Sequence, residues 1–169
     1  PFINADLHEA AHLQHIADPT ARSEAARQWA DAQRAQCLAQ GATFVSETVF
    51  SHPSKLALID AARRAGFVVT LLAVGLSDPQ RLLERVRRRV GEGGHPVPAE
   101  RILARYPRTL ANLAVAVRRA HVALLYDSEE VVPGTHRLVA VCQGAHTRTQ
   151  VDPMPAWAAT VLGGDAPPR

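Results

Sequence analysis

Apolar side chains fall into two kinds of run along this chain. Short runs rich in β-branched and aliphatic residues predict β-strands, and runs with helical spacing predict helices. Strands are expected at Phe2–Ile3, Thr43–Val49, Phe67–Val74, Val122–Tyr126 and Leu138–Cys142. Helices are expected over Pro19–Gln40, from His52 to Ala65, in two arginine-rich segments within 78–119, and in a short segment after Pro155.

The expected strands and helices alternate along the chain. This order is typical of an α/β fold with a mainly parallel sheet and helices on both faces. Phe67–Val74 is almost uniformly apolar, which is typical of a strand covered on both faces. A length of 169 residues fits one domain with its own core, so we expect a single domain over 1–169.

Composition argues against several classes of protein. No apolar run reaches the roughly 18 residues of a membrane span, and the start, PFINADLHEA, lacks the basic and apolar regions of a signal peptide. We therefore expect no membrane partner. Cys37 and Cys142 are isolated and form no metal-binding spacing, so free thiols and a cytoplasmic location are expected.

Positive charge is concentrated between Asp78 and Arg119. This stretch holds ten arginines and no lysine against four acids, whereas the formal net charge of the whole chain is only +3. Arginine presents a planar fork of donors that suits phosphate oxygens. A loop rich in glycine and proline separates the two helices, so we predict an arginine-rich helix–loop–helix lid over about 78–112. The alternative is that these arginines are ordinary solvated side chains on two surface helices.

A net positive charge would permit nucleic-acid binding. However, the basic excess is local, and no aromatic residues are interleaved with it as a platform for single strands would require. The sequence therefore argues against a nucleic-acid partner.

Polar side chains follow the first two expected strands. Asp6 comes just after Phe2–Ile3, and Glu47 and Thr48 end the next run. The carboxyl ends of parallel strands form the edge where open α/β sheets bind ligands. Both acids also have structural alternatives, because Asp6 can cap the following helix and Glu47 can form a structural ion pair.

Three histidines follow at helical spacing, namely His8, His12 and His15. No cysteine or close set of carboxylates completes a metal site with them, so we interpret them as solvated side chains of a helix.

A distinctive combination of segments runs from Phe2 to about Ser128: FINAD, SET, ERVRRRVGEGGHPVPAERILARYPRTLANL and LLYDS. Together these segments resemble the zeta-toxin-like P-loop kinases, a group often labelled predicted ATPases. The resemblance implies a P-loop NTPase-type three-layer sandwich. It also implies transfer of a phosphoryl group from ATP or GTP, with Mg²⁺, to a small-molecule acceptor. For the characterised toxins this acceptor is UDP-N-acetylglucosamine.

The resemblance assigns roles to single residues. Asp6 matches the catalytic carboxylate that takes the proton of the acceptor hydroxyl. The lid supplies the catalytic arginines, which are drawn from Arg85, Arg89, Arg105 and Arg108. The substrate-binding positions are Asn4, Glu47, Thr48 and His95. No residue of this chain is assigned to the metal.

The chain departs from the family at one point. The phosphate-binding loop G-x-x-x-x-G-K-[ST] does not occur in this sequence, and Gly91, Gly93 and Gly94 lie in the lid without a following lysine. That loop supplies the amides, the lysine and the Mg²⁺-binding hydroxyl that hold the nucleotide. Because the sequence starts with Pro1 and not Met, we expect the loop upstream, on a strand that is central in the sheet.

Two other functions stay open. One is a non-catalytic binding or regulatory module, which pairs with an antitoxin protein in a toxin–antitoxin complex or binds polyanions through its arginines. The other is a kinase for a different small acceptor, such as an antibiotic or a sugar, because a fold alone does not decide the substrate.

Overall fold

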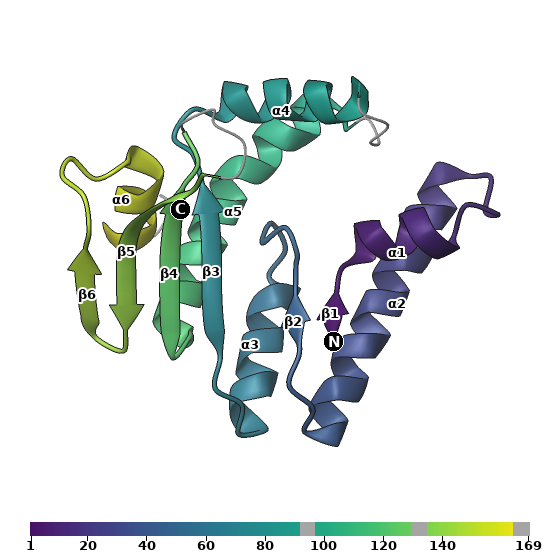
Figure 1. The fold of residues 1–169 in the computed structure, drawn as a ribbon, viewed down its shortest axis with the longest axis horizontal. Helices are drawn as coiled ribbons and strands as arrows, with labels where there is room; N and C mark the ends of the chain where they lie inside the picture. Colours follow the sequence, from purple (N-terminus) through teal and green to yellow (C-terminus); the bar gives the residue numbers. More distant parts are fainter. Residues whose placement is uncertain (92–96, 130–134, 164–169) are drawn as a thin grey trace. The chain divides into compact units, whose positions relative to one another are not determined.

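The structure is a computed structural model that describes residues 1–91, 97–129 and 135–163, without the side chain of Arg89 (Figure 1). The described helices are α1 (Ala5–His12), α2 (Pro19–Gln40), α3 (Ser54–Arg64), α4 (Pro79–Gly91), α5 (Ala99–Arg119) and α6 (Ala156–Gly163). The described strands are β1 (Phe2–Ile3), β2 (Val45–Ser46), β3 (Thr70–Gly75), β4 (Val122–Asp127), β5 (Arg137–Gln143) and β6 (His146–Thr149). No helix in this part of the chain is long and apolar enough to cross a membrane.

The fold is α/β, as the alternating pattern predicts, but the pairing of its strands is mixed. β1 and β2 form a parallel pair, and the other four strands form a sheet in the order β3-β4-β5-β6. β3 and β4 run parallel, whereas β5 is antiparallel to β4 and β6 is antiparallel to β5. The prediction of a mainly parallel sheet is therefore wrong for these four strands.

The length of the connections explains this difference. A parallel pairing needs a crossover of about a dozen residues or more. Only nine residues, 128–136, join β4 to β5, and only Gly144 and Ala145 join β5 to β6. Both connections are too short for a crossover, so each returns the chain in the opposite direction. The hydrophobic pattern does not predict β6, because its sequence HTRT contains no apolar residue and is exposed throughout.

Two strands are shorter than their apolar runs. β2 covers only Val45–Ser46 of the expected run Thr43–Val49, because its partner β1 offers only two residues for pairing. β3 begins at Thr70, three residues after the start of its run, and the backbone amide of Val69 donates to Nδ1 of His121 at 2.9 Å. The runs predict where strands occur, but the available partner decides how long each one is.

The chain forms two compact units. The N-terminal unit comprises Pro1–Val49 and Ala61–Phe67, and the C-terminal unit comprises Phe50–Asp60 and Val68–Arg169. The single domain expected over 1–169 stays a prediction.

In the N-terminal unit, α2 packs against the β1–β2 pair. The carboxylate of Asp18 caps α2 by accepting a hydrogen bond of 2.7 Å from the Ala21 amide. The helix ends at Gly41, whose φ of 64° lies in the left-handed region that favours glycine. The buried centre of this unit contains Ile3, Ala30 and Cys37.

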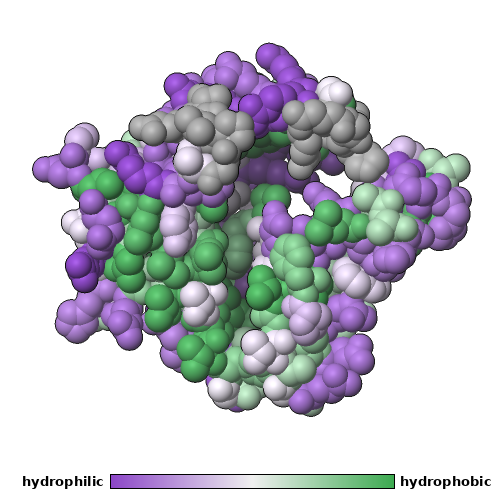
Figure 2. Space-filling model, viewed as in Figure 1, coloured by the Kyte–Doolittle hydropathy of each residue, from purple (hydrophilic) through white to green (hydrophobic). Residues whose placement is uncertain are grey.

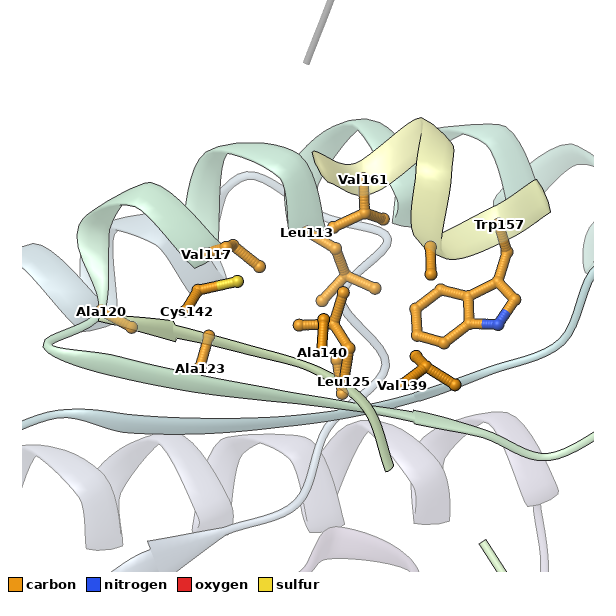
Figure 3. Packing of buried hydrophobic residues seen from close by; sticks show 12 residues of the cluster. Leu113, Val117, Ala120, Ala123, Leu125, Val139, Ala140, Cys142, Trp157 and Val161 are labelled. Carbon is orange, nitrogen blue, oxygen red and sulfur yellow. The ribbon is translucent and has the colours of Figure 1, made fainter. Parts of the chain in front are cut away.

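In the C-terminal unit, α5 and α6 pack on one face of the four-stranded sheet (Figure 3). The indole of Trp157 from α6 lies against the backbone of β3. A Cβ atom on Gly75 would come within 2.4 Å of Cδ2 of this indole, so the contact requires glycine. The buried core residues are Ala73, Leu113, Val117, Ala120, Ala123, Leu125, Val139, Ala140, Cys142, Trp157, Ala158 and Val161.

Candidate functional site at the carboxyl ends of two parallel strand pairs

The first candidate site lies at the carboxyl end of the β1–β2 pair. Asn4 follows β1 directly and Glu47 follows β2 directly, and the parallel register pairs Ile3 with Ser46. This register brings the two polar side chains together at one edge, as expected for parallel strands. The Nδ2 atom of Asn4 donates a hydrogen bond of 2.7 Å to Oε2 of Glu47. The partner of Glu47 is therefore an amide, and the structural ion pair considered for Glu47 does not form among the described residues.

Asn4 also starts the first helix. Its Oδ1 atom accepts a hydrogen bond of 3.0 Å from the Leu7 amide, so Asn4 is the N-cap of α1. Asp6 lies in the first turn of that helix and is not the cap. Its carboxylate is exposed, and within the described parts of the chain it has no hydrogen-bond or ion-pair partner. The Asp6 carboxylate, two residues after Asn4, is thus available to an added ligand.

Thr48 follows Glu47 and is half-buried. Its hydroxyl lies 3.5 Å from the carbonyl oxygen of Val49, a weak contact at the limit of a hydrogen bond. The hydroxyl therefore retains capacity to bind another group at the same edge.

A buried arginine supports this edge. Arg34 of α2 is only 5% exposed, and its guanidinium donates to Asp31 at 2.5 Å and to the Ser46 hydroxyl at 3.0 Å. Through Ser46, it holds the last residue of β2, which precedes Glu47. The sequence contained a signal for this role, because Arg34 occupies the helical stripe between Ala30 and Cys37, where buried side chains are expected.

The histidines of the first helix have different surroundings. His8 is half-buried and stacks on Trp29, with ring centroids 3.7 Å apart and planes inclined by 1°. Burial, and then the charge of nearby His12, lower the pKa of His8 below its ordinary value. The interpretation as solvated side chains is therefore wrong for His8, while His12 and His15 are exposed.

The second candidate site lies at the carboxyl end of the β3–β4 pair. Glu129, just after β4, accepts a hydrogen bond of 2.8 Å from the Ser77 amide, just after β3. Arg81, in the first turn of α4, donates to the carbonyl oxygen of Glu129 at 2.5 Å, and its Nε lies 3.4 Å from the Glu129 carboxylate. The start of α4 is thus fixed to the chain that leaves β4.

The predicted lid arginines differ in what they contact. Arg85 is half-buried and donates to the main-chain carbonyl of Ser128, so it is already occupied in this structure. Arg108 is exposed and donates to Ala104 of its own helix at 3.1 Å. Arg105 has no partner among the described residues. The side chain of Arg89, the loop 92–96 and His95 within it lie outside the described residues.

The second lid helix is anchored to the same sheet edge. The Tyr106 hydroxyl donates to the carbonyl oxygen of Leu76 at 2.8 Å, and burial, with the charges of Glu129 and Asp78, raises the pKa of Tyr106. Asn112 of the same helix donates to the carbonyl oxygen of Phe50 at 2.8 Å. Both polar side chains of α5 therefore bind backbone and hold the helix in place.

A cavity of about 390 Å³ opens beside this second edge. Asp127 contributes a buried carboxylate, which accepts a hydrogen bond of 2.8 Å from Nε1 of Trp157. The hydrophobic pattern alone does not predict this site, since Arg137 lies opposite Asp127 only through the pairing of β4 with β5. The lining residues are Ser77, Asp127, Glu129, Arg137, Pro153, Met154 and Pro155.

Asp6 belongs to the N-terminal unit, and Arg85, Arg105 and Arg108 belong to the C-terminal unit. Within one unit, the structure brings together Asn4 and Glu47. Asp6 and Thr48 follow them by two positions and one position in the sequence. Comparison with known proteins gave no match to this chain among protein-family models, curated proteins or solved structures.

Proposed function

We propose that this protein is a small-molecule kinase of the zeta-toxin type, built on a P-loop NTPase-type three-layer sandwich. It transfers a phosphoryl group from ATP or GTP to a hydroxyl of a nucleotide sugar such as UDP-N-acetylglucosamine. The observation that carries the proposal is the Asn4–Glu47 hydrogen bond at the carboxyl end of a parallel strand pair, with the exposed Asp6 two residues after Asn4.

In the proposed reaction, Asp6 is the general base. Its carboxylate has no partner in the described part of the chain and lies in the first turn of α1. An ionised carboxylate can accept a hydrogen bond from the acceptor hydroxyl and take its proton as the oxygen attacks phosphorus.

The Asn4–Glu47 pair binds the acceptor. The amide of Asn4 has a second N–H, and the carboxylate of Glu47 has a second oxygen, so the pair still offers a donor and an acceptor. A sugar hydroxyl both donates and accepts, and the pair matches it. Thr48 adds a hydroxyl at the same edge.

The lid arginines stabilise the moving phosphoryl group, whose charge is spread over its oxygens. Arg105 and Arg108 are the better candidates, because neither is bound to another element within the described residues. Arg85 would first have to leave the carbonyl of Ser128.

The described residues show no metal-binding group for Mg²⁺, and the sequence lacks the loop that would hold the nucleotide. The sequence has no G-x-x-x-x-G-K-[ST] loop, and the described residues contain no group of three or more histidines, cysteines or carboxylates placed to hold a metal ion. We therefore derive no step through Mg²⁺, and the roles given above belong only to residues of this chain.

The test is phosphate transfer from radiolabelled ATP to UDP-N-acetylglucosamine by the complete gene product. We expect Asp6→Asn to lower kcat by about 100-fold or more, as loss of a general base does. The matched control is Asp18→Asn, since asparagine also caps helices well and Asp18 lies far from the site in sequence. A rate within twofold of the unsubstituted protein for Asp6→Asn would exclude the assigned role.

One observation favours a second candidate, a non-catalytic regulatory module that binds an antitoxin protein or a polyanion. Arg81 and Arg85 are both occupied by the main chain after β4, so part of the arginine cluster is structural. This candidate predicts no turnover and binding that weakens steeply with salt. Both candidates are placed in the cytoplasm, where the buried free thiols of Cys37 and Cys142 would stay reduced.

A further inference from the structure

A charged side chain occupies the buried face of α2. The buried residues of this helix are Ala26, Ala30, Arg34 and Cys37, so Arg34 interrupts an otherwise apolar stripe. Hydrophilic (purple) residues are numerous where α1 and α2 lie in Figures 1 and 2, as expected for helices with one face in water. The Arg34 side chain is withdrawn from that solvated face, since it is 6% exposed, whereas the side chain of Arg27 is 56% exposed.

The guanidinium of Arg34 joins α2 to the end of β2. Its Nη2 atom donates to Oδ1 of Asp31 at 2.5 Å, and its Nη1 atom donates to the hydroxyl of Ser46 at 3.0 Å. The other carboxylate oxygen of Asp31 accepts a hydrogen bond of 2.8 Å from Arg27. Asp31 is therefore held from two sides, and it gives the guanidinium a fixed point on the helix.

The strand that Arg34 holds is too short to hold itself. β1 and β2 have two residues each, and beyond them the Glu47 amide donates to the carbonyl oxygen of Ile3 at 3.1 Å. A pair of such short strands is marginal without contacts to another element. β1 is anchored by Ile3, which is 2% exposed in the core of the unit, but Val45 of β2 is 62% exposed. The side-chain anchor of β2 is Ser46, through its bond to Arg34.

We propose that Arg34 is a positioning residue for the Asn4–Glu47 pair, and that it acts through Ser46. By fixing the last residue of β2, it fixes the backbone of Glu47, so that the carboxylate meets the Asn4 amide and keeps its second oxygen for the acceptor. Arg34 itself is assigned no contact with the acceptor. The inference rests on the proposed function where it gives this pair an acceptor hydroxyl to bind.

The alternative is that Arg34 contributes to stability alone. For that purpose a buried charge is a costly choice, because an apolar side chain of similar size often stabilises a protein as well or better. The planar guanidinium differs from an apolar side chain in that it fixes two acceptors in one geometry. A role in stability would act on the whole unit, whereas a positioning role acts on the acceptor through Glu47. This difference can be measured.

The first test is a double-mutant cycle on the complete gene product, with the Kd of UDP-N-acetylglucosamine measured by calorimetry. We expect Arg34→Lys to raise this Kd and the KM for the acceptor about tenfold, with kcat unchanged within about twofold. In a Glu47→Ala background, the same substitution should change the Kd by less than about twofold, because the carboxylate that it positions is absent. Arg27→Lys is the matched control, since Arg27 also binds Asp31 but is exposed, and it should leave the Kd within about twofold.

A Kd that is unchanged by Arg34→Lys would overturn the proposal. The same factor in both backgrounds would also overturn it, because independent effects multiply and would indicate a role in stability alone. If Arg34→Lys does not fold, Ser46→Ala takes its place in the cycle, because it breaks the same link from the strand end.

The second test needs no acceptor, so it separates this inference from the proposed function. If the complete gene product neither binds nor phosphorylates UDP-N-acetylglucosamine, the proposed function is wrong, and the side-chain amide NMR signals of Asn4 then decide the inference. We expect Arg34→Lys and Ser46→Ala to shift these signals, because both weaken the hold on Glu47, the partner of that amide. Arg27→Lys should leave them in place. Signals that stay unchanged in both Arg34→Lys and Ser46→Ala would overturn the proposal.

Discussion

The side-chain amide of Asn4 donates a hydrogen bond of 2.7 Å to the carboxylate of Glu47, although 43 positions separate the two residues in the sequence. The contact exists because β1 and β2 run parallel and end at the same edge. Asn4 simultaneously caps α1. One residue therefore starts the helix that carries Asp6 and also binds the carboxylate of Glu47.

Substitutions can separate the two roles of Asn4, as the cap of α1 and as the donor to Glu47. Asn4→Ala removes both the cap and the donor to Glu47, and we expect it to lower the free energy of unfolding by about 1 kcal/mol, mainly through the cap. Glu47→Gln keeps the cap and removes only the charge at an exposed position, so its stability should change by less than about 0.5 kcal/mol. Urea denaturation of the two variants measures the difference. Equal losses of stability would contradict the assignment of the cap to Asn4.

The buried guanidinium of Arg34 should be sensitive to a change that keeps its charge. Lysine at this position cannot donate to both Asp31 and Ser46 with a planar fork, so we expect Arg34→Lys to cost about 1–2 kcal/mol of stability. Arg27→Lys on the same helix is the control. Arg27 is 56% exposed, and its ion pairs with Glu24 and Asp31 should contribute little. A loss for Arg27→Lys as large as for Arg34→Lys would show that burial of Arg34 is not the cause.

Gly75 should not tolerate a side chain. Because a Cβ atom would meet the indole of Trp157 at 2.4 Å, Gly75→Ala must displace α6 or the ring, and we expect a loss of about 2–3 kcal/mol. A Cβ atom on Gly163, at the end of the same helix, would meet no atom of the described residues within 4 Å. Gly163→Ala should therefore leave stability unchanged or raise it slightly. Thermal unfolding followed by tryptophan fluorescence compares the variants, and a neutral Gly75→Ala would contradict the packing of Trp157 on β3.

The pKa of His8 is lowered in the folded protein, first by burial and then by the charge of His12. The unfolded chain therefore binds a proton more readily near the ordinary value of 6.5, so stability should fall as pH drops through that value. His8→Phe keeps a ring on Trp29 and removes this titration, so the loss of stability between about pH 7 and pH 5 should become smaller. His15→Gln, at an exposed position, is the control and should keep the pH dependence. An unchanged pH dependence in His8→Phe would contradict the lowered pKa.

Local pattern was sufficient for much of the fold. It predicts the helices α2 to α6 and the places of five of the six described strands, because apolar spacing and residues that start or end helices, such as Pro79 and Gly41, act over a few positions. It also places Asp6 and Glu47 after successive strands. It does not predict β6, whose exposed polar residues become a strand only by pairing with β5.

By itself, the sequence determined the α/β class, the grouping of arginines on α4 and α5, and the polar residues that follow β1 and β2. Those features depend on neighbours along the chain. Only the tertiary structure decided that β5 and β6 turn back antiparallel, that Arg85 is bound to Ser128, and that Leu72 and Val74 of β3 do not join the buried core. These outcomes depend on which distant segments pair and which face a helix covers, and no spacing within a single segment contains that information.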